Sequence, residues 1–315
     1  MTLSSTPRPS TNAEPPPSSG PRPTIAIIGL GRVGTALGRA ITAAGYTIRA
    51  VSSRDPHKAQ VAAQAFGAEP LSAVEAARSA ELVLLTVSDD AITTVARELG
   101  AAGAWRPGQS VVHASGASPA SALEPAAEYG ATIGAFHPLA AFATYDAILM
   151  PGITFAIEAP SPLHATLADL AHALNGHALD LAPEDKTLYH AAAVIASNYT
   201  IALAALATQI FEQLGATTEQ GLQALLPLMR TTLDNLERQG LPTALTGPLV
   251  RGDVGTVRRH IHALDHTIPH VGSLYRCLAH GALPLAQQRG LSADLVGQLQ
   301  DTITLPSELS LEHEI

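Results

Sequence analysis

The sequence predicts a doubly wound, mostly parallel α/β sheet that is followed by a second, all-helical domain. Three observations lead to this fold class: short apolar strands alternate with helices over residues 24–182, a glycine-rich turn follows the first strand, and residues 183–301 are helical in pattern throughout. Alternating strands and helices favour a parallel sheet that is covered by helices on both faces. The chain has 315 residues, which is long enough for two separate cores.

Continuous apolar runs mark the strands, because a strand of a parallel sheet is buried on both faces. The predicted strands are residues 25–28, 46–51, 81–87, 109–114, 131–136, 153–157 and 177–181, with a short segment near Ala68. The predicted helices between them are residues 35–44, 56–66, 91–99 and 163–174. In the second domain we expect helices over residues 184–214, 218–239, 254–264 and about 271–288. We expect Asp253 to cap one of them, and Pro227 and Pro284 to start or kink others.

The turn after the first strand has the spacing of a dinucleotide-binding, or Rossmann, fingerprint: Gly29, Leu30, Gly31, Arg32, Val33 and Gly34. In such a turn Gly29 allows the tight bend, Gly31 lets the backbone approach phosphate oxygens, and Gly34 lets helix and strand pack closely. The helix N-terminus then offers unpaired N–H groups and a partial positive charge to the pyrophosphate. We therefore expect a bound dinucleotide, and the alternative is a glycine turn with a purely structural role.

The second strand helps to choose the dinucleotide. NAD-binding proteins usually carry an acidic residue about 20 residues after the glycines, where it binds the ribose hydroxyls. Here that position holds Ser53 and Arg54, and the first acid is Asp55. A hydroxyl and a guanidinium suit a 2′-phosphate, so the sequence favours NADP over NAD, unless Arg54 is only a solvated loop residue. Val87 and Ser88, at the end of a later strand, are further candidates for cofactor binding.

Composition excludes several classes of protein. The net charge of −9 and the lack of a basic run argue against nucleic acid as a partner. The single cysteine, Cys277, rules out an internal disulfide framework and fits a reducing compartment, so we expect a cytoplasmic protein. Residues 1–23 are rich in proline and serine and lack the apolar core of a secretory signal, so we expect a disordered tail there. Residues 302–315 are expected to form a flexible acidic tail.

Candidate substrate-binding residues follow the predicted strands at their carboxyl ends, where ligands bind in open parallel sheets. Ser115 and Gly116 follow one strand, and His137 follows the next. Ser115 and Gly116 would bring hydroxyl and backbone donors close to a nicotinamide or a substrate carbonyl. A tight turn that needs small residues explains the same pair equally well.

The helix that opens the second domain carries polar residues on one apolar face. Lys186 and His190 lie about 40° apart around this helix, and Ser197 falls between them. Such groups need partners once their face is covered, and a dinucleotide crevice would supply them. The alternative is a solvated Lys186 and a histidine that is satisfied within the core.

Two further features are candidate binding sites. Arg251 stands just before the helix that Asp253 is expected to cap, where it would hold a substrate carboxylate or serve as an ordinary surface residue. The histidines at positions 260, 262, 266 and 270 lack the spacing of a zinc site, Pro269 disturbs the helix, and arginines stand nearby. We therefore predict no metal site.

Together these motifs resemble a family in the 6-phosphogluconate-dehydrogenase-like superfamily, whose members join a Rossmann-like domain to a helical C-terminal domain of unknown function. The resemblance extends over about residues 24–290 and is carried by the segments GLGRVG, HASGA, FHPL, EDKTLYHAAAVIASN and ALTGPLVRGD. The last two segments are the specific ones. A more distant similarity connects the chain to ketopantoate reductases, β-hydroxyacid dehydrogenases, pyrroline-carboxylate reductases and deazaflavin-dependent NADP reductases.

The resemblance implies roles for individual residues. The hydroxyacid and ketopantoate enzymes carry a general-acid lysine on the first helix after the Rossmann domain, and Lys186 occupies that position. Four residues later they carry an asparagine that assists the lysine, and this chain has His190 at that position. Asn198 is a candidate to take over the role of the missing asparagine. Thr246 and Arg251 lie in the family's ALTGPLVRGD segment and are expected to orient the substrate.

On this basis we expect an NADP-dependent oxidoreductase that reduces a small carbonyl compound, such as the 2-oxo acid ketopantoate. Lys186, assisted by His190, would protonate the forming alkoxide. Two alternatives stay open. One is the reduction of an imine or a deazaflavin with the same cofactor, and the other is a non-catalytic protein that senses NADP(H).

Residues 191–211 are apolar nearly all round and about long enough to cross a membrane. They contain Ser197, Asn198 and Thr208 and lack basic flanks, so we favour a buried helix in a soluble domain and expect no membrane partner. A helix of this kind also suggests a homodimer through the helical domain. Burial inside a single subunit would explain the same pattern.

Overall fold

The computed structural model describes residues 22–304, so most of the two predicted tails, residues 1–21 and 305–315, lies outside the described chain. The described residues form two compact units, which divide between residues 194 and 195. The first unit is built on a β-sheet and the second is helical, which confirms the predicted fold class. The sequence places the change from strands to helices at residue 182, and the last strand ends at Asp180.

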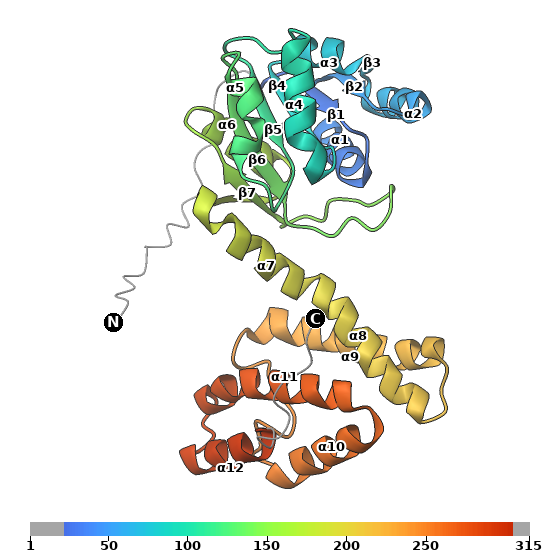
Figure 1. Cartoon of the computed structure of the whole chain (residues 1–315), viewed down its shortest axis with the longest axis vertical. Helices are drawn as coiled ribbons and strands as arrows, with labels where there is room; N and C mark the ends of the chain where they lie inside the picture. Colours follow the sequence, from blue (N-terminus) through green and yellow to red (C-terminus); the bar gives the residue numbers. More distant parts are fainter. Residues whose placement is uncertain (1–21, 305–315) are drawn as a thin grey trace, which may run out of the picture. The chain divides into compact units, whose positions relative to one another are not determined.

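An eight-stranded sheet with the order β3-β2-β1-β4-β5-β6-β7-β8 forms the first unit (Figure 1). Its strands are β1 Ile25–Ile28, β2 Ile48–Ser52, β3 Glu69–Pro70, β4 Leu82–Leu85, β5 Ser110–His113, β6 Thr132–Pro138, β7 Thr154–Glu158 and β8 His177–Asp180. Neighbouring strands are parallel except β6 and β7, which pair antiparallel. The strand order reverses between β1 and β4, and ligands bind at such a switch point in open α/β sheets.

Helices cover both faces of this sheet. They are α1 Arg32–Ala43, α2 Pro56–Phe66, α3 Ala73–Ser79, α4 Ile92–Ala101, α5 Glu124–Ala127 and α6 Leu163–Ala173. Successive side chains of a strand point to opposite faces. On β4, Leu82 and Leu84 therefore pack in the core beneath α1, α2 and α6, whereas Val83 and Leu85 pack beneath α3, α4 and α5.

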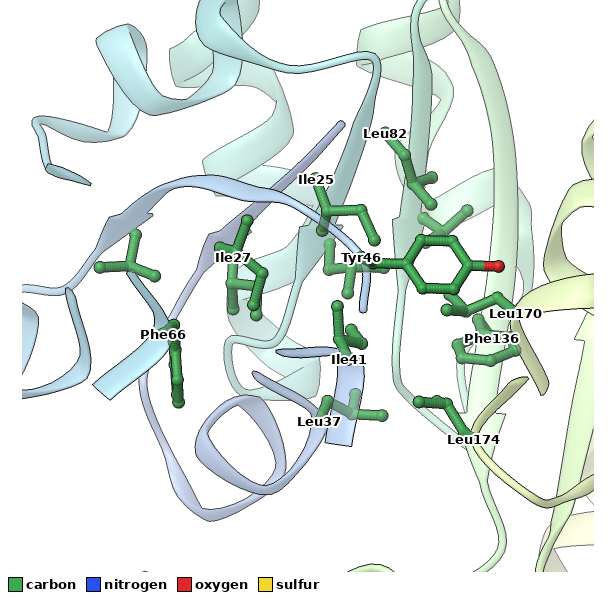
Figure 2. Close-up of a cluster of buried hydrophobic side chains, with 14 of the residues drawn as sticks. Ile25, Ile27, Leu37, Ile41, Tyr46, Phe66, Leu82, Phe136, Leu170 and Leu174 are labelled. Atoms are coloured by element: carbon green, nitrogen blue, oxygen red, sulfur yellow. The ribbon is translucent and has the colours of Figure 1, made fainter. Parts of the chain in front are cut away.

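The larger of the two cores joins the antiparallel end of the sheet to the helices on its face (Figure 2). Phe136 of β6 stacks on Phe155 of β7, with ring centroids 4.6 Å apart and planes at 10°. Leu170 and Leu174 are buried in the same cluster. This packing fixes the register between β6 and β7, which carry His137 and Glu158 of the candidate site described below near their ends.

The second unit contains α8 Asn198–Gln213, α9 Thr218–Gln239, α10 Val254–Thr267, α11 Pro269–Gln288 and α12 Ala293–Ile303. It continues from α7, Lys186–Ala196, most of which belongs to the first unit. Helix α8 packs on α9, and α10, α11 and α12 share a small apolar core. Asp253 caps α10 as predicted, because its carboxylate accepts the N–H of Thr256 at 2.9 Å.

Several predicted details are corrected. The sequence pattern did not indicate α3 or α12. Because α12 continues to Ile303, which is 3% exposed, Thr302 and Ile303 do not belong to a flexible tail. Pro227 and Pro284 lie inside α9 and α11, so neither proline starts a helix.

The alternative of an apolar helix that is buried within a single subunit does not fit the structure. Residues 183–213 have a window with a mean hydropathy of 1.6 and are long and apolar enough to cross a membrane, but 6% of that window is buried. The same length and composition occur in core helices of soluble proteins, so they do not by themselves indicate a membrane span. Large apolar side chains such as Ile195 and Ile201 are 62% and 71% exposed.

The stacked phenylalanines should contribute strongly to the free energy of unfolding of the first unit. Phe136→Ala should lower the free energy of unfolding of the first unit by about 3–5 kcal/mol, because it removes a fully buried ring and leaves a cavity. Denaturant titration followed by circular dichroism measures the loss. Val61→Ala, at a side chain that is 53% exposed, is the control and should cost far less. Equal losses in the two variants would show that the stack does not organise this core.

Candidate active site

The predicted glycine turn joins β1 to α1. Gly29 has φ +104°, a left-handed conformation that glycine adopts without strain. Gly31 is the N-cap of α1, and as a glycine it has no side chain to accept from the first N–H groups of the helix, which suits them to binding an anion. Thr86, which follows β4, fixes the turn by donating its hydroxyl to the carbonyl of Gly29 at 2.5 Å.

The three glycines fit the roles that a dinucleotide requires. A Cβ on Gly34 would lie 2.2 Å from the carbonyl oxygen of Gly29, so only glycine allows this approach of helix and turn. A Cβ on Gly29 would lie 2.8 Å from the backbone of Thr86. At Gly31, by contrast, no described atom lies within 4 Å of the Cβ position, which leaves room for a phosphate. The cradle therefore fits the pyrophosphate of NADP.

Of the other residues predicted to bind the cofactor, some serve packing and others lie exposed at or beside the turn. Leu30 is buried in the core and Val33 packs against it, so their side chains serve packing. Arg32 is exposed and donates to the carbonyl of Ala143. The backbone N of Val87 lies 2.9 Å from the Cβ position of Gly29, which places Val87 at the turn, and the exposed Ser88 follows it.

The end of β2 leaves the predicted phosphate-binding residues accessible. Arg54 is exposed, and the Ser53 hydroxyl accepts the N–H of Asp55. Asp55 itself is the N-cap of α2, because its carboxylate accepts the N–H groups of His57 and Lys58. A pocket between α1 and α2 begins beside the turn, and its polar lining includes Arg39, His57, Lys58 and Tyr145.

A buried ion pair lies at the start of α7. Lys186 is 2% exposed, and its Nζ lies 3.4 Å from Oε2 of Glu158, whose side chain is 9% exposed. Glu158 ends β7, and its other carboxylate oxygen accepts the backbone N–H of Ala120 at 3.0 Å. Burial lowers the pKa of Lys186, and the Glu158 carboxylate opposes this shift. The predicted alternative of a solvated Lys186 is therefore wrong.

This pair stands level with the carboxyl end of the parallel strands. Glu158 pairs with Ala135, and Ala135 pairs in turn with His113, the last residue of β5. His113 is 1% exposed, and its Nε2 lies 3.0 Å from the carbonyl of Pro119. Its Nδ1 accepts the N–H of Ser115. Burial lowers the pKa of His113 to about 4, so the ring is neutral at pH 7.

Ser115 is buried, and its hydroxyl accepts the N–H groups of Ala117 and Ser118. This hydroxyl therefore holds the turn after β5, which matches the structural alternative for this residue. It still has a proton to donate, so its assignment to the substrate stays a prediction.

Three more side chains complete the cluster. The hydroxyl of Tyr189 lies 2.8 Å from Nδ1 of His137, and the two rings meet edge to face. The Cβ position of Gly116 lies 2.8 Å from Nε2 of His137 and 3.0 Å from Nδ1 of His190. The structure thus places His137 and Gly116 beside His190 and near Lys186. The sequence paired Lys186 with His190 and proposed the other two residues separately.

The remaining predicted residues belong to the second unit. Asn198 begins α8, and Thr246 and Arg251 lie in the turns between α9 and α10. Their assignment to the substrate stays a prediction.

The sequence analysis did not propose Glu158 and Tyr189 as site residues, although the position of each indicated one. Glu158 directly follows a predicted strand, and Tyr189 stands three residues after Lys186, on the same side of the helix. Among residues 22–304 no group of histidine, cysteine and acidic side chains is arranged to hold a metal ion.

Comparison with family models identifies both parts of the chain. Residues 8–138 match the model of the Rossmann-like domain. Residues 153–281 match the model of a domain of unknown function, DUF2520. The chain thus joins a Rossmann-like domain to a DUF2520 domain, which confirms the resemblance drawn from its motifs. No curated protein matches the sequence.

Solved structures with the same two-part fold include a candidate NADP oxidoreductase from Bacteroides fragilis, which is 26% identical with a TM-score of 0.65. A protein from Thermotoga maritima is 25% identical with a TM-score of 0.68. Each match covers 84% of this chain and 98% of the other. A reductive aminase from Aspergillus terreus, in complex with NADPH and ethyl-5-oxohexanoate, is 20% identical with a TM-score of 0.56, over 90% of this chain and 93% of that one. At this identity the last match shows the fold alone.

The buried imidazole of His113 predicts acid sensitivity of the first unit. The unfolded histidine binds a proton near pH 6.5, whereas the folded one does so only near pH 4. The stabilisation is therefore complete above pH 6.5 and is lost as the pH falls toward 4. Denaturant titrations between pH 7 and 4.5 measure this slope, which should be smaller in His113→Gln. His57→Gln, at an exposed histidine, should leave the slope unchanged, and equal slopes in all three proteins would contradict the assignment.

Proposed function

We propose that this chain is an NADP-dependent oxidoreductase that reduces a small carbonyl compound, with a 2-oxo acid such as ketopantoate as the favoured substrate. The observation that carries the proposal is the buried Lys186–Glu158 pair, which lies at the carboxyl edge of a sheet whose first turn is a dinucleotide cradle. We also place the protein in the cytoplasm, because its single cysteine suits a reducing compartment.

NADP is favoured over NAD by the residues around the end of β2. The first acid after this strand, Asp55, is used to cap α2, so its carboxylate is engaged with backbone N–H groups. Arg54 is exposed beside it, and Arg39 and Lys58 line the adjoining pocket. Cationic side chains in this position suit a 2′-phosphate. The similarity to the candidate NADP oxidoreductase of B. fragilis supports the same cofactor.

Bound NADPH supplies a hydride to the carbonyl carbon of the substrate. Lys186 would then give a proton from Nζ to the carbonyl oxygen, which has kept the electron pair of the C=O bond. Burial lowers the pKa of this amine toward the working pH, which makes it a better acid than a solvated lysine. The Glu158 carboxylate favours the protonated amine and holds it in place.

Removal of the acid should slow turnover and spare cofactor binding. A single Lys186→Met change would leave Glu158 buried and unpaired, so the test compares Lys186→Met/Glu158→Gln with Glu158→Gln alone. The double variant should lose about 100-fold or more in kcat with ketopantoate, as expected for a lost general acid. The Kd for NADPH, from quenching of protein fluorescence, should match that of Glu158→Gln. Equal kcat values in the two variants would reject Lys186 as the acid.

A substrate screen separates this reaction from the alternatives. NADPH oxidation is followed with ketopantoate and other 2-oxo acids, with cyclic imines, and with a deazaflavin. Turnover of imines or the deazaflavin alone would replace the carbonyl assignment. Tight NADPH binding with no oxidation by any acceptor would instead favour a protein that senses NADP(H).

We further propose that the exposed apolar helices are covered by a second copy of the chain. Helix α9 is 22 residues long, and Gly221 is its one buried residue. Apolar side chains on this helix and on α8 are widely exposed: Ile201, Leu222, Leu228, Leu233 and Leu236. An exposed apolar surface on two adjacent helices marks an interaction site. A second copy offers the same surface in return, which makes a symmetric dimer the simplest cover.

Size-exclusion chromatography with light scattering tests the dimer. The native chain should have twice the monomer mass of 32.5 kDa. Leu228→Glu should shift it to the monomer, because the charge would be buried at the interface. Gln223→Glu adds the same charge to the same helix, about 140° away, and should leave the dimer intact. A native monomer, or a species that is monodisperse only with detergent, would contradict the dimer, and the second outcome would favour a membrane.

A further inference from the structure

The segment between β6 and β7, residues 139–153, reaches back to the part of the first unit that is expected to bind the cofactor. Figure 1 shows it as a long green loop. The carbonyl of Ala143 accepts a hydrogen bond from Nη1 of Arg32, in the glycine turn, at 3.2 Å. Two residues later, Tyr145 contacts the first turn of α2: Nζ of Lys58 lies 3.0 Å from its hydroxyl oxygen and 4.6 Å from the centre of its ring. The segment thus touches both places where phosphate groups of NADP are expected.

The chemistry of lysine fixes the direction of the hydrogen bond between Lys58 and Tyr145. This bond raises the pKa of Lys58 above its usual value, so the amine is protonated at pH 7 and has donors only. The Tyr145 oxygen is therefore the acceptor, and the hydroxyl keeps its own proton for a second acceptor. The same bond lowers the pKa of Tyr145, which makes its hydroxyl a stronger donor. Tyr145 is 50% exposed, so a ligand can reach it.

Both side chains lie near the end of β2, where the ribose of a bound dinucleotide is expected. The N–H of Gly29 donates to the carbonyl of Ser52 at 2.9 Å, so the end of β2 adjoins the glycine turn. A pyrophosphate at the start of α1 therefore places the adjoining ribose at this strand end. A pocket of about 240 Å³ opens here between α1 and α2, and its lining includes Leu30, Lys58 and Tyr145. A 2′-phosphate that enters this pocket from the ribose meets Lys58 and Tyr145 together.

We propose that Tyr145 binds the 2′-phosphate of NADP together with Lys58, and that the segment between β6 and β7 thereby helps to select NADP over NAD. The inference rests on the proposed function and deepens it, because it adds to the cofactor site a residue that lies 87 positions after Lys58. The amine has further N–H groups and the phenol has one O–H, and these two donor atoms lie 3.0 Å apart. They can therefore reach different oxygens of one phosphate. The ribose hydroxyl that NAD carries instead offers a single oxygen without charge.

The charges around the phenol suit an anion. Lys58 and Arg32 are the cations near its hydroxyl, and Asp55 is the opposing acid. The Asp55 carboxylate already accepts two backbone N–H groups as the cap of α2. A second acid, Asp146, lies near Arg39. These three cations outnumber the two acids, and the phenol adds a donor to a charged acceptor without adding a charge.

Calorimetric titration of the full chain with NADPH and with NADH tests the role of the Tyr145 hydroxyl. Tyr145→Phe keeps the ring and removes the donor. It should raise the Kd for NADPH about tenfold, as expected for a lost hydrogen bond to a charged group, and leave the Kd for NADH unchanged. Tyr129→Phe makes the same change at a 43% exposed tyrosine outside the pocket and should change neither Kd. An unchanged Kd for NADPH in Tyr145→Phe, or equal losses for the two cofactors, would overturn the inference.

A second comparison tests whether Lys58 and Tyr145 bind the same phosphate. Lys58→Met should raise the Kd for NADPH and spare that for NADH. Tyr145→Phe should then cost less in the Lys58→Met background than in the native chain, because Lys58 no longer orients the hydroxyl. Effects on the Kd for NADPH that simply multiply would contradict a shared phosphate.

These titrations need no turnover, so they separate the inference from the proposed function. If no acceptor is reduced but Tyr145→Phe still weakens NADPH selectively, the reductase assignment fails and the role of Tyr145 stands. If acceptors are reduced and Tyr145→Phe leaves the Kd for NADPH native, the role of Tyr145 fails and the reductase assignment stands.

Discussion

The buried pair of Lys186 and Glu158 is the constraint on which the candidate site depends. An ammonium that is 2% exposed is tolerated only with a partner, since an isolated charge of this kind would cost far more than the fold gains. The pair ties the start of α7 to the end of β7, and Glu158 also holds the backbone of Ala120. Three segments that are distant in sequence therefore meet at one point, and α7 brings Tyr189 and His190 with it.

Around this ion pair, charged and neutral side chains have different tasks. Lys186 is the cation of the cluster, and it is one reason why His113 and His137 stay neutral. The neutral rings donate and accept hydrogen bonds without changing charge near pH 7. One acid with a lowered pKa beside rings that stay neutral suits the proposed reduction of a carbonyl group, because Lys186 is then the group that delivers the proton near pH 7.

Much of the first unit could be predicted because its signals are local. The apolar strands and the glycine spacing identify the sheet and the cradle. In the second unit, the cap of α10 by Asp253 is a local signal of the same kind. The site was predicted less completely. Lys186 and His190 were found from their helix face, but Glu158 becomes meaningful only once β7 is known to pair antiparallel with β6, which is a long-range property.

The apolar helix could be predicted as an element, but its surroundings could not. Its composition is the same whether it is buried in its own subunit, in a dimer or in a membrane, so the sequence left these alternatives open, and the low burial in the structure argues against the first. Helix α12 was missed although Ser292 caps it, because its short apolar face becomes distinct only when it packs against α10 and α11.

The most direct test of the central claim is a crystal structure of the full chain with NADP and a non-reactive 2-oxo acid analogue such as oxamate. The claim predicts the pyrophosphate on the N–H groups after Gly31. It also predicts the analogue's carbonyl oxygen within hydrogen-bonding distance of Lys186 Nζ. A nicotinamide ring and an analogue bound away from this nitrogen, with Lys186 still enclosed beside Glu158, would show that the pair only stabilises the fold.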